Sequence, residues 1–118
     1  MSEAYDLFKE GQQRLRAGRN AQATVPLERA KRLEPAKASI REALGIAYFR
    51  LARWHEAESE FRTIVEELSP TDHYAHYALG RALERQGRTT EANAHYKLAS
   101  SMKPGSETYA ARILDLEA

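Results

Sequence analysis

Apolar residues recur every three or four positions along most of the chain, which is the period of an amphipathic α-helix. In the first such stretch, Leu7, Gly11 and Leu15 are four residues apart, and Gly18 follows as a residue type that commonly ends helices. The expected helices cover residues 3–17, 37–51, 54–68, 71–86, 89–102 and 107–116, with one more between a cap at Asn20 and Leu33.

The helical pattern repeats at a nearly fixed interval. Gly11, Gly45 and Gly80 are separated by 34 and 35 residues. Two further series keep steps of the same lengths, namely Ala23, Ala57 and Ala92, and Pro35, Pro70 and Pro104. A polar turn lies between each repeat glycine and the repeat alanine that follows it. Each unit is therefore predicted to consist of a helix, a short turn and a second helix.

The second unit contains one extra residue. Leu33, Leu68 and Met102 each stand two residues before the proline that closes their unit, so the spacing at this point is constant. We therefore expect the extra residue between Ile64 and Leu68. It would lie near a helix end, where an insertion disturbs packing least.

The repeated motif resembles the tetratricopeptide repeat, a helix–turn–helix unit of about 34 residues. The motif residues of the second unit are Leu44, Gly45, Tyr48, Ala57, Phe61 and Pro70. The third unit matches well, whereas Glu10 and Arg14 of the first unit stand where Leu and Tyr are expected. The resemblance covers residues 4–104. Because proline is familiar at this place in such repeats, we expect Pro26 to stay inside its helix, with a slight kink.

The resemblance implies an all-α fold, a right-handed α–α superhelix (solenoid) of three helix–turn–helix repeats with a seventh, capping helix. The expected single domain spans residues 1–118, with repeats at 4–36, 37–71 and 72–105 and the capping helix at 106–117. The end of a repeat stack exposes an apolar face that needs a cover. We expect Tyr109, Ile113 and Leu116 to pack on the sixth helix for this reason.

The repeat glycines need a packing reason, because glycine inside a helix costs about 1 kcal/mol relative to alanine. We expect the three repeat alanines to lie opposite the three repeat glycines within each hairpin. Phe61 and Tyr96 are then expected to fill the space between hairpins.

Composition narrows the class of protein. The 118 residues are 42% hydrophobic and 30% charged, as in one globular domain, and the net charge of +1 argues against nucleic-acid or membrane partners. No apolar run approaches the roughly 20 residues of a membrane helix, and the first residues lack the pattern of a signal peptide. Cysteine is absent. A cytoplasmic location fits, although a piece of a larger protein would look the same.

We expect no enzyme activity, no cofactor and no metal site, because no nucleophile motif or glycine-rich phosphate loop is present. His73 and His76 lie three residues apart on one expected helix, a spacing that can place both on a metal. No third ligand is evident, however, and His76 stands at a packing position. We interpret His55 and His95 as surface residues, and the glutamates within residues 56–67 as a solvated outer face.

In the family that the chain resembles, the first helices of successive units line a concave groove that generally binds partner proteins. We infer the groove positions from their offset to the repeat glycine: six and three residues before it, and one, four and five residues after it. Several of these positions, which have no expected packing role, are aromatic and suggest a binding surface. The expected partner-binding residues are Tyr5, Phe8, Gln12, Ile46, Phe49, Arg50, Tyr74, Tyr77 and Arg81. The same offsets also select Leu15, Arg16, Ser39, Glu42, Glu84 and Arg85.

Two functions remain open. The first is an adaptor or scaffold that binds a peptide or helical segment of a partner protein in the groove. The second is a self-associating scaffold, a homo-oligomer that uses the groove or the repeat ends. Some members of the family hold the terminal carboxylate of chaperones with a Lys/Asn/Arg clamp. Because Gln12, Ala43, Tyr74 and Ala78 stand at most of those places and only Lys9 nearby has the right character, chaperone tails are not expected ligands.

Overall fold

The computed structural model describes residues 2–117, with side chains described for residues 2–113. Within this range the chain forms seven α-helices and one π-helical turn, and it contains no β-strand, so the all-α prediction is confirmed. The elements are α1 (Glu3–Arg16), α2 (Asn20–Leu33), α3 (Ala38–Arg50), α4 (Trp54–Thr63), η1 (Ile64–Leu68), α5 (His73–Glu84), α6 (Thr89–Met102) and α7 (Glu107–Glu117).

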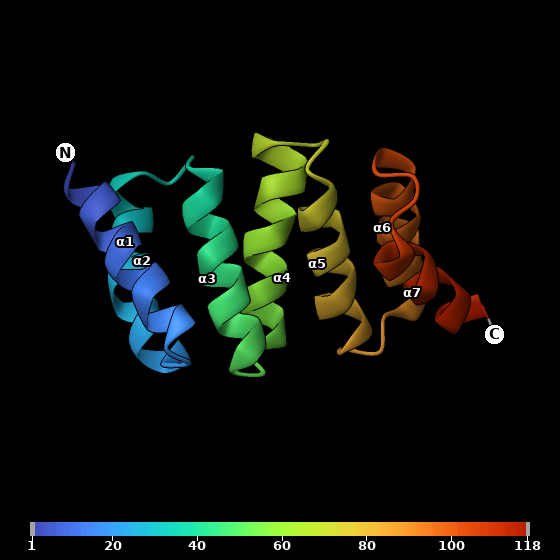
Figure 1. Cartoon of the computed structure of the whole chain (residues 1–118), viewed down its shortest axis with the longest axis horizontal. Helices are drawn as coiled ribbons and strands as arrows, with labels where there is room; N and C mark the ends of the chain where they lie inside the picture. The colour runs from blue at the N-terminus through green and yellow to red at the C-terminus, as the bar shows by residue number, and fades with distance from the viewer. Residues whose placement is uncertain (1, 118) are drawn as a thin grey trace.

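Three helical hairpins stand side by side and form an elongated stack of 46 × 25 × 21 Å (Figure 1). The hairpins are α1/α2, α3/α4 and α5/α6, and each packs against the next in chain order. In Figure 1, α1 lies in front of α2, and α7 lies in front of α6. The predicted solenoid of three repeats with a seventh helix at its end is therefore present.

Each hairpin turn needs one residue in the left-handed backbone region. Gly18 and Gly87 fill this position in the first and third hairpins, with φ of 76° and 80°. Ala52 fills it in the second hairpin with φ of 59°, a conformation that its Cβ disfavours. The turn geometry is thus the same in all three hairpins, even though the residue type is not.

The repeat glycines face large side chains, and our prediction about their neighbours needs correction. A Cβ on Gly45 would lie 2.7 Å from two atoms of the Phe61 ring, and one on Gly80 would lie 2.6 Å from the Tyr96 ring. Gly11 faces Leu27 in the same way. The side chain four residues after each repeat alanine therefore fills the space inside its own hairpin, where we had expected the alanine itself. For Phe61 and Tyr96 this also corrects the expectation that they fill the space between hairpins. At Gly80 the alanine also comes close, through the carbonyl oxygen of Ala92 at 3.1 Å.

The extra residue of the second unit is absorbed where the sequence predicts it. Residues Ile64–Leu68 form a π-helical turn, and the N–H of Ser69 donates to the carbonyl oxygen of Ile64 at 2.7 Å. A π-helical turn accommodates one additional residue without ending the helix. Pro26 also stays inside its helix, as expected.

The glutamates of residues 56–67 are only in part a solvated face. Glu66 and Glu67 are exposed, but Glu60 is only 3% exposed. Its carboxylate accepts hydrogen bonds from Lys31 Nζ at 2.7 Å and from Arg41 Nη1 at 3.0 Å. These two cations come from the preceding hairpin and from α3, so the buried charge connects three consecutive helices.

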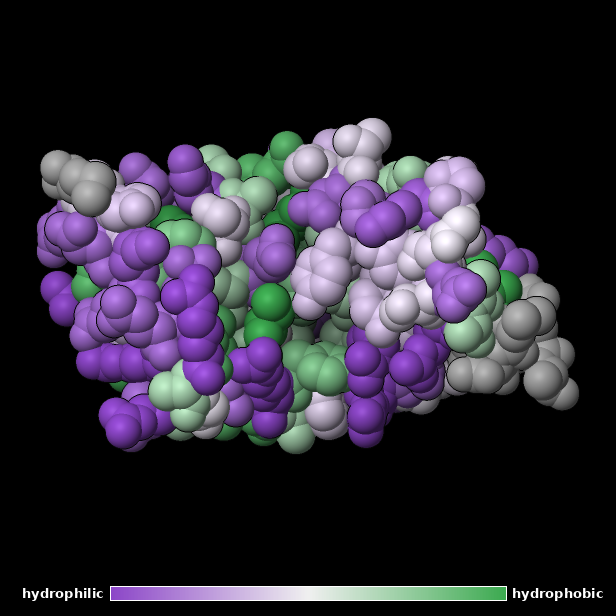
Figure 2. Space-filling model, viewed as in Figure 1, coloured by the Kyte–Doolittle hydropathy of each residue, from purple (hydrophilic) through white to green (hydrophobic). Residues whose placement is uncertain are grey.

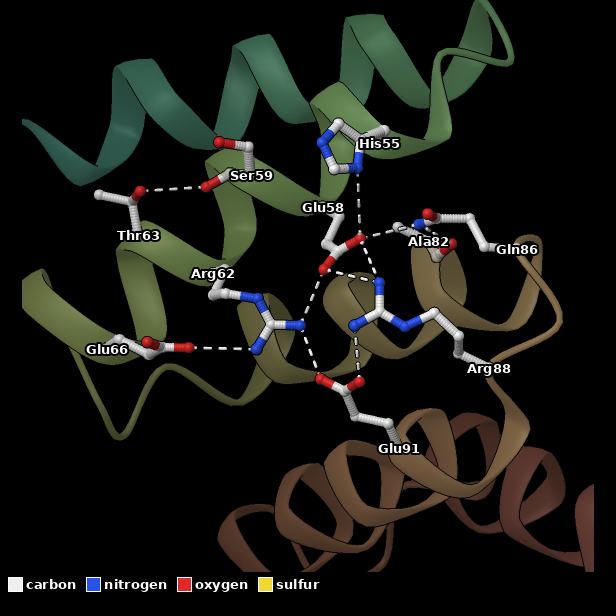
Figure 3. Close-up of polar contacts among 10 residues, drawn as sticks. All are labelled: His55, Glu58, Ser59, Arg62, Thr63, Glu66, Ala82, Gln86, Arg88 and Glu91. Carbon is white, nitrogen blue, oxygen red and sulfur yellow. Dashed lines mark hydrogen bonds and ion pairs between the residues drawn. The ribbon is translucent and has the colours of Figure 1, made fainter.

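Glu58 is the second buried carboxylate of this region, and it joins the second hairpin to the third (Figure 3). It accepts hydrogen bonds from Arg62 at 2.9 Å, Gln86 at 3.0 Å and Arg88 at 2.9 Å. Both arginines also contact Glu91 of α6. Burial alone would raise the pKa of Glu58, but the hydrogen bonds from Arg62 and Gln86 and the charge of Arg88 hold that pKa below its usual value.

The seventh helix packs on α6, as expected. Tyr109 is 6% exposed, but its side chain also reaches α5, beyond the sixth helix that we had expected: its hydroxyl lies 2.8 Å from Nδ1 of His73, and its ring lies 5.0 Å from that of Tyr77. Ile113 packs against the core, whereas the side chain of Leu116 lies outside the described residues.

No helix in the described part of the chain is long and apolar enough to cross a membrane.

Candidate functional site

The first helices of the three hairpins line a series of adjoining hollows. The central hollow, of about 190 Å³, lies between α3 and α5. Its lining comprises Ile46, Phe49, Arg50, Phe61, Tyr74, Tyr77, Ala78 and Arg81. Two further hollows, of about 240 and 310 Å³, lie toward the N-terminus. Ile46 lines both the central hollow and the second one, and Phe8 lines both the second and the third.

These shared residues make the three hollows one continuous surface, which we call the groove. All nine residues that the sequence predicts for partner binding line it. Tyr5 and Phe8 belong to the N-terminal hollow, and Gln12 belongs to the second. Figure 2 shows hydrophobic side chains in green in the middle of the viewed face, with hydrophilic side chains around them. Whether this surface binds a partner stays a prediction.

Phe49 is the aromatic centre of the groove. Its ring meets Trp54 edge to face at 4.9 Å between centroids. The guanidinium of Arg81 lies 5.0 Å from the same ring and that of Arg85 lies 5.9 Å from it, and Arg85 also stands 5.3 Å from Trp54. Such cation–π contacts hold arginines over an aromatic side chain while their N–H groups stay able to donate. Trp54 belongs to α4, and the groove offsets did not select it.

Tyr74 and Tyr77 also carry packing roles, which the sequence did not indicate. Both are partly buried against the core. Tyr74 lies 6.4 Å from Phe61, and Tyr77 lies 5.9 Å from Tyr96 and 5.0 Å from Tyr109. Burial, followed by the charge of the nearby Glu42, raises the pKa of Tyr74, so its hydroxyl stays protonated at neutral pH. The groove wall is therefore continuous with the core, and large truncations there will affect stability.

Charged side chains occupy both borders of the groove. Arg50 donates through Nη1 to the carbonyl oxygen of Leu15 at 3.1 Å and thereby ties α3 to the end of α1. Glu42 lines the second hollow, and burial together with the charge of Asp72 raises its pKa. Glu84, which the groove offsets also selected, instead accepts a hydrogen bond from the hydroxyl of Tyr96 at 2.8 Å.

Phe61 and Ala78 line the central hollow but were not selected from the sequence. Phe61 belongs to a second helix, and the offset rule considers first helices only. Its ring reaches the hollow because Gly45 leaves room for it across the hairpin. Gly45 was thus the sequence feature that could have indicated Phe61, although the connection between this glycine and the groove depends on tertiary packing.

The histidines of the third hairpin form a stacked pair. Nε2 of His76 donates to the carbonyl oxygen of Pro70 at 2.8 Å, and its Nδ1 lies 3.1 Å from Nδ1 of His95. His95 is half-buried, which corrects its interpretation as a surface residue, whereas His55 is exposed as expected. Burial, His76 and Arg62 lower the pKa of His95. Among the described residues no group of three side chains could hold a metal ion.

The chain is similar to a known protein in sequence and to solved structures in fold. Superkiller complex protein 3 of the mouse (Mus musculus) is 32% identical over 96 residues, which are 81% of this chain but 6% of that protein. This chain therefore spans a small part of the length of that relative. The first TPR of Spaghetti (RPAP3), bound to an HSP90 peptide, superposes with a TM-score of 0.93 at 20% identity and covers 98% of this chain and 90% of its own. MamA superposes with a TM-score of 0.92 at 23% identity, covering 96% of this chain and 66% of its own.

The two solved structures support the fold, and the family assignment rests on the sequence. The family model of the tetratricopeptide repeat matches residues 8–73 and, in a second register, residues 42–107. The two overlapping matches cover most of the chain and are displaced by one repeat, in agreement with the glycine series and with the three hairpins. The chain belongs to the tetratricopeptide repeat family.

Proposed function

We propose that this chain is a protein-interaction module that holds a peptide or helical segment of a partner protein in its groove, as an adaptor or scaffold. The observation that carries the proposal is the central hollow, where Phe49, Tyr74 and Tyr77 present aromatic surface on the inner helices. Aromatic and arginine side chains are enriched among the residues that dominate binding energies. The binding of an HSP90 peptide by the RPAP3 domain, which has the same fold, supports this class of function.

The size of the central hollow favours side chains of a macromolecular partner over a small molecule. Typical sites for drug-sized ligands have volumes of about 300–1,000 Å³ and enclose most of the ligand. The central hollow has about 190 Å³. Its two neighbours continue it along the stack, so a partner segment lying across the groove would place successive side chains in successive hollows.

The partner sequence is proposed to differ from the chaperone peptides of the similar structures. In this chain Ala43 and Ala78 stand at places where a carboxylate clamp has polar or basic residues, and both are largely buried. Ala78 lines the central hollow, where it widens the apolar floor. We therefore propose that side-chain anchors, and not a terminal carboxylate, provide most of the binding energy.

The test is a peptide selection followed by titration. A displayed peptide library is selected on the wild-type protein, and the affinity of selected peptides is then measured by calorimetry. Phe49→Ala should weaken binding by more than about tenfold, since truncated aromatic anchors cost about 2 kcal/mol or more. Leu98→Ala, at an exposed position of α6 on an outer helix, serves as the control and should leave the affinity unchanged.

Circular dichroism of each variant separates loss of binding from loss of folding. Phe49 is preferable to Tyr77 for this test, because Tyr77 contacts Tyr96 and Tyr109 and its truncation would loosen α7. Equal affinities of the folded Phe49→Ala variant and the wild type would show that the groove is the wrong surface.

Light scattering addresses self-association, the alternative function. A monomer has a mass of 13.4 kDa. A dimer that dissociates in the Phe49→Ala variant would show that a second copy of the chain occupies the groove, and it would contradict binding of a foreign peptide there.

A further inference from the structure

A row of three arginines follows one border of the groove. Arg16, Arg50 and Arg85 each stand five residues after the repeat glycine of their unit. Arg16 and Arg50 are the last residues of α1 and α3, and Arg85 is the C-cap of α5. The repeat architecture therefore places these three arginines at the same end of the three inner helices. We call them the arginine row.

None of the three has a carboxylate partner within the described residues. Arg50 uses Nη1 on the backbone carbonyl of Leu15, and Arg85 stacks on Phe49 and Trp54. Arg16 is exposed and lines the second hollow. All three side chains thus keep guanidinium N–H groups available to an external acceptor.

Two arginines at the outer helices α4 and α6 behave differently. Arg62 contacts the carboxylates of Glu58, Glu66 and Glu91, and Arg88 contacts those of Glu58 and Glu91. A positive charge in the last turn of a helix is favourable with respect to the helix dipole, which accounts for a cation at each position of the row. The helix dipole does not by itself explain why none of the three arginines of the row pairs with a carboxylate.

The opposite border of the groove carries negative charge. Glu42 precedes Arg50 by eight residues on α3, which corresponds to about 12 Å along the helix axis. Asp72 is the N-cap of α5, and its charge acts on Glu42. The two borders of the groove therefore carry opposite charges. The arginine row lies at the C-terminal ends of the inner helices, and the acidic groups lie toward their N-terminal ends.

We propose that the arginine row binds the carboxylates of an acidic, extended segment of a partner protein. The inference rests on the proposed function and specifies the chemistry of the partner. Successive inner helices lie at least one helix-packing distance of about 8–10 Å apart, and an extended chain advances about 3.3 Å per residue. Acidic residues three or more positions apart can therefore meet successive arginines, while apolar residues between them reach the hollows. Arginine suits this role because its planar guanidinium can pair with a carboxylate through two parallel hydrogen bonds.

The geometry favours a peptide over a single-stranded nucleic acid. Proteins that bind single strands offer aromatic rings on which bases stack. Here Arg81 and Arg85 lie over the ring of Phe49, and Trp54 meets it edge to face. Tyr77 packs beside three other tyrosine rings, whose centroids lie 5.0–6.3 Å from its own. The acidic border at Glu42 would also repel a phosphate backbone.

The experiment uses a fluorescein-labelled peptide of repeated Asp-Ala-Leu triplets, acetylated and amidated so that no terminal carboxylate is present. A peptide of the same composition with its aspartates adjacent at one end is the spacing control. Anisotropy gives the affinity for the full chain. Trp54, the single tryptophan, reports whether the peptide reaches the row, because Arg85 lies against its ring.

The matched variants remove two positive charges each. Arg16→Gln/Arg85→Gln changes the row and spares Arg50, whose bond to Leu15 is structural. Arg19→Gln/Arg32→Gln removes two exposed arginines that also lack a carboxylate partner in the described chain. We expect the row variant to weaken binding of the triplet peptide about tenfold and to reduce its sensitivity to salt. The control variant should change the affinity less than about twofold.

Several results would overturn the inference. One is that the triplet peptide fails to bind the wild type at low ionic strength, and another is that both variants weaken binding equally. Equal affinity for the clustered control peptide would reduce the effect to general charge attraction. A uridylate oligonucleotide that binds more tightly and depends on the same arginines would assign the row to phosphates. If Phe49→Ala abolishes binding while the row variant does not, the groove function stands and the proposal of an acidic partner is wrong. If neither variant has an effect, the proposal that the groove binds the partner is wrong.

Discussion

Gly45→Ala tests the close approach that shapes both the second hairpin and the groove. An alanine Cβ at this position would lie 2.7 Å from Cε2 and from Cζ of Phe61. Carbon atoms in favourable contact are about 3.5–4.0 Å apart, so the ring would have to move by about 1 Å. Phe61 is only 1% exposed and meets Tyr74 edge to face, so a displaced ring has little free space to enter.

The net effect is the difference between two opposing terms. Alanine stabilises a helix interior by about 1 kcal/mol relative to glycine. Overpacking of a well-packed core costs about 1–3 kcal/mol. We therefore expect Gly45→Ala to lower the free energy of unfolding by up to about 2 kcal/mol, which for a domain of this size lowers the melting temperature by several degrees.

A double-mutant cycle separates the two terms. In a Phe61→Ala background the ring is gone, so Gly45→Ala should keep the gain in helix propensity and raise the free energy of unfolding relative to Phe61→Ala alone. The measurement is urea denaturation followed by circular dichroism for all four proteins. A Gly45→Ala single variant that is more stable than the wild type would refute the reasoning, because it would show that the ring can move freely.

Four further predictions concern stability. Ala52→Gly should raise the melting temperature, corresponding to up to about 1 kcal/mol, because glycine adopts positive φ without a Cβ clash; a lower melting temperature in calorimetry would contradict this. Glu58→Gln should lower the free energy of unfolding by about 1–3 kcal/mol at pH 7 in urea titrations. Because the folded-state pKa of Glu58 is lowered, its contribution is present above about pH 4.5 and is lost as the pH falls through that folded-state pKa, so wild type and variant should converge in acid. The pKa of His95 is also lowered in the folded state, so the unfolded chain binds a proton first and stability should fall as the pH drops below about 6.5. Thermal melts between about pH 7.5 and pH 5.5 should show that a His95→Gln variant loses most of this pH dependence. Deletion of the residues after Pro104 should lower the melting temperature or cause aggregation, and an unchanged melting curve with a monodisperse sample would show that α7 is dispensable.

The sequence was sufficient for the features that depend on local periodicity. The recurrence of Gly11, Gly45 and Gly80 predicted three hairpins, and the constant spacing before each closing proline placed the extra residue at Ile64–Leu68. Because a helix repeats every 3.6 residues, the offset from the glycine also identified the inner face. All nine predicted binding residues therefore line the groove.

Features that depend on contacts between hairpins could not be predicted in the same way. Glu58 and Glu60 occur in a polar, glutamate-rich helix, and nothing local indicates that they are buried. Lys31 lies 29 residues before its partner Glu60, and Arg88 lies 30 residues after its partner Glu58. These ion pairs therefore form only when adjacent repeats dock. The packing role of Tyr77 likewise depends on Tyr109, which belongs to a helix outside the repeat pattern.

The way in which the hairpins contact each other has a consequence for how the molecule opens. Extensive contacts connect helices that follow one another in the chain, and within the described residues no extensive contact connects the first hairpin with the third. In such a chain each unit is stabilised by its interfaces with its immediate neighbours, so the units at the ends have fewer stabilising interfaces than the unit in the middle. Amide hydrogen exchange should therefore be slowest in α3 and α4 and faster toward α1 and α7. The central hollow, which spans α3 and α5, would then retain its shape while the ends of the groove open and close around a partner.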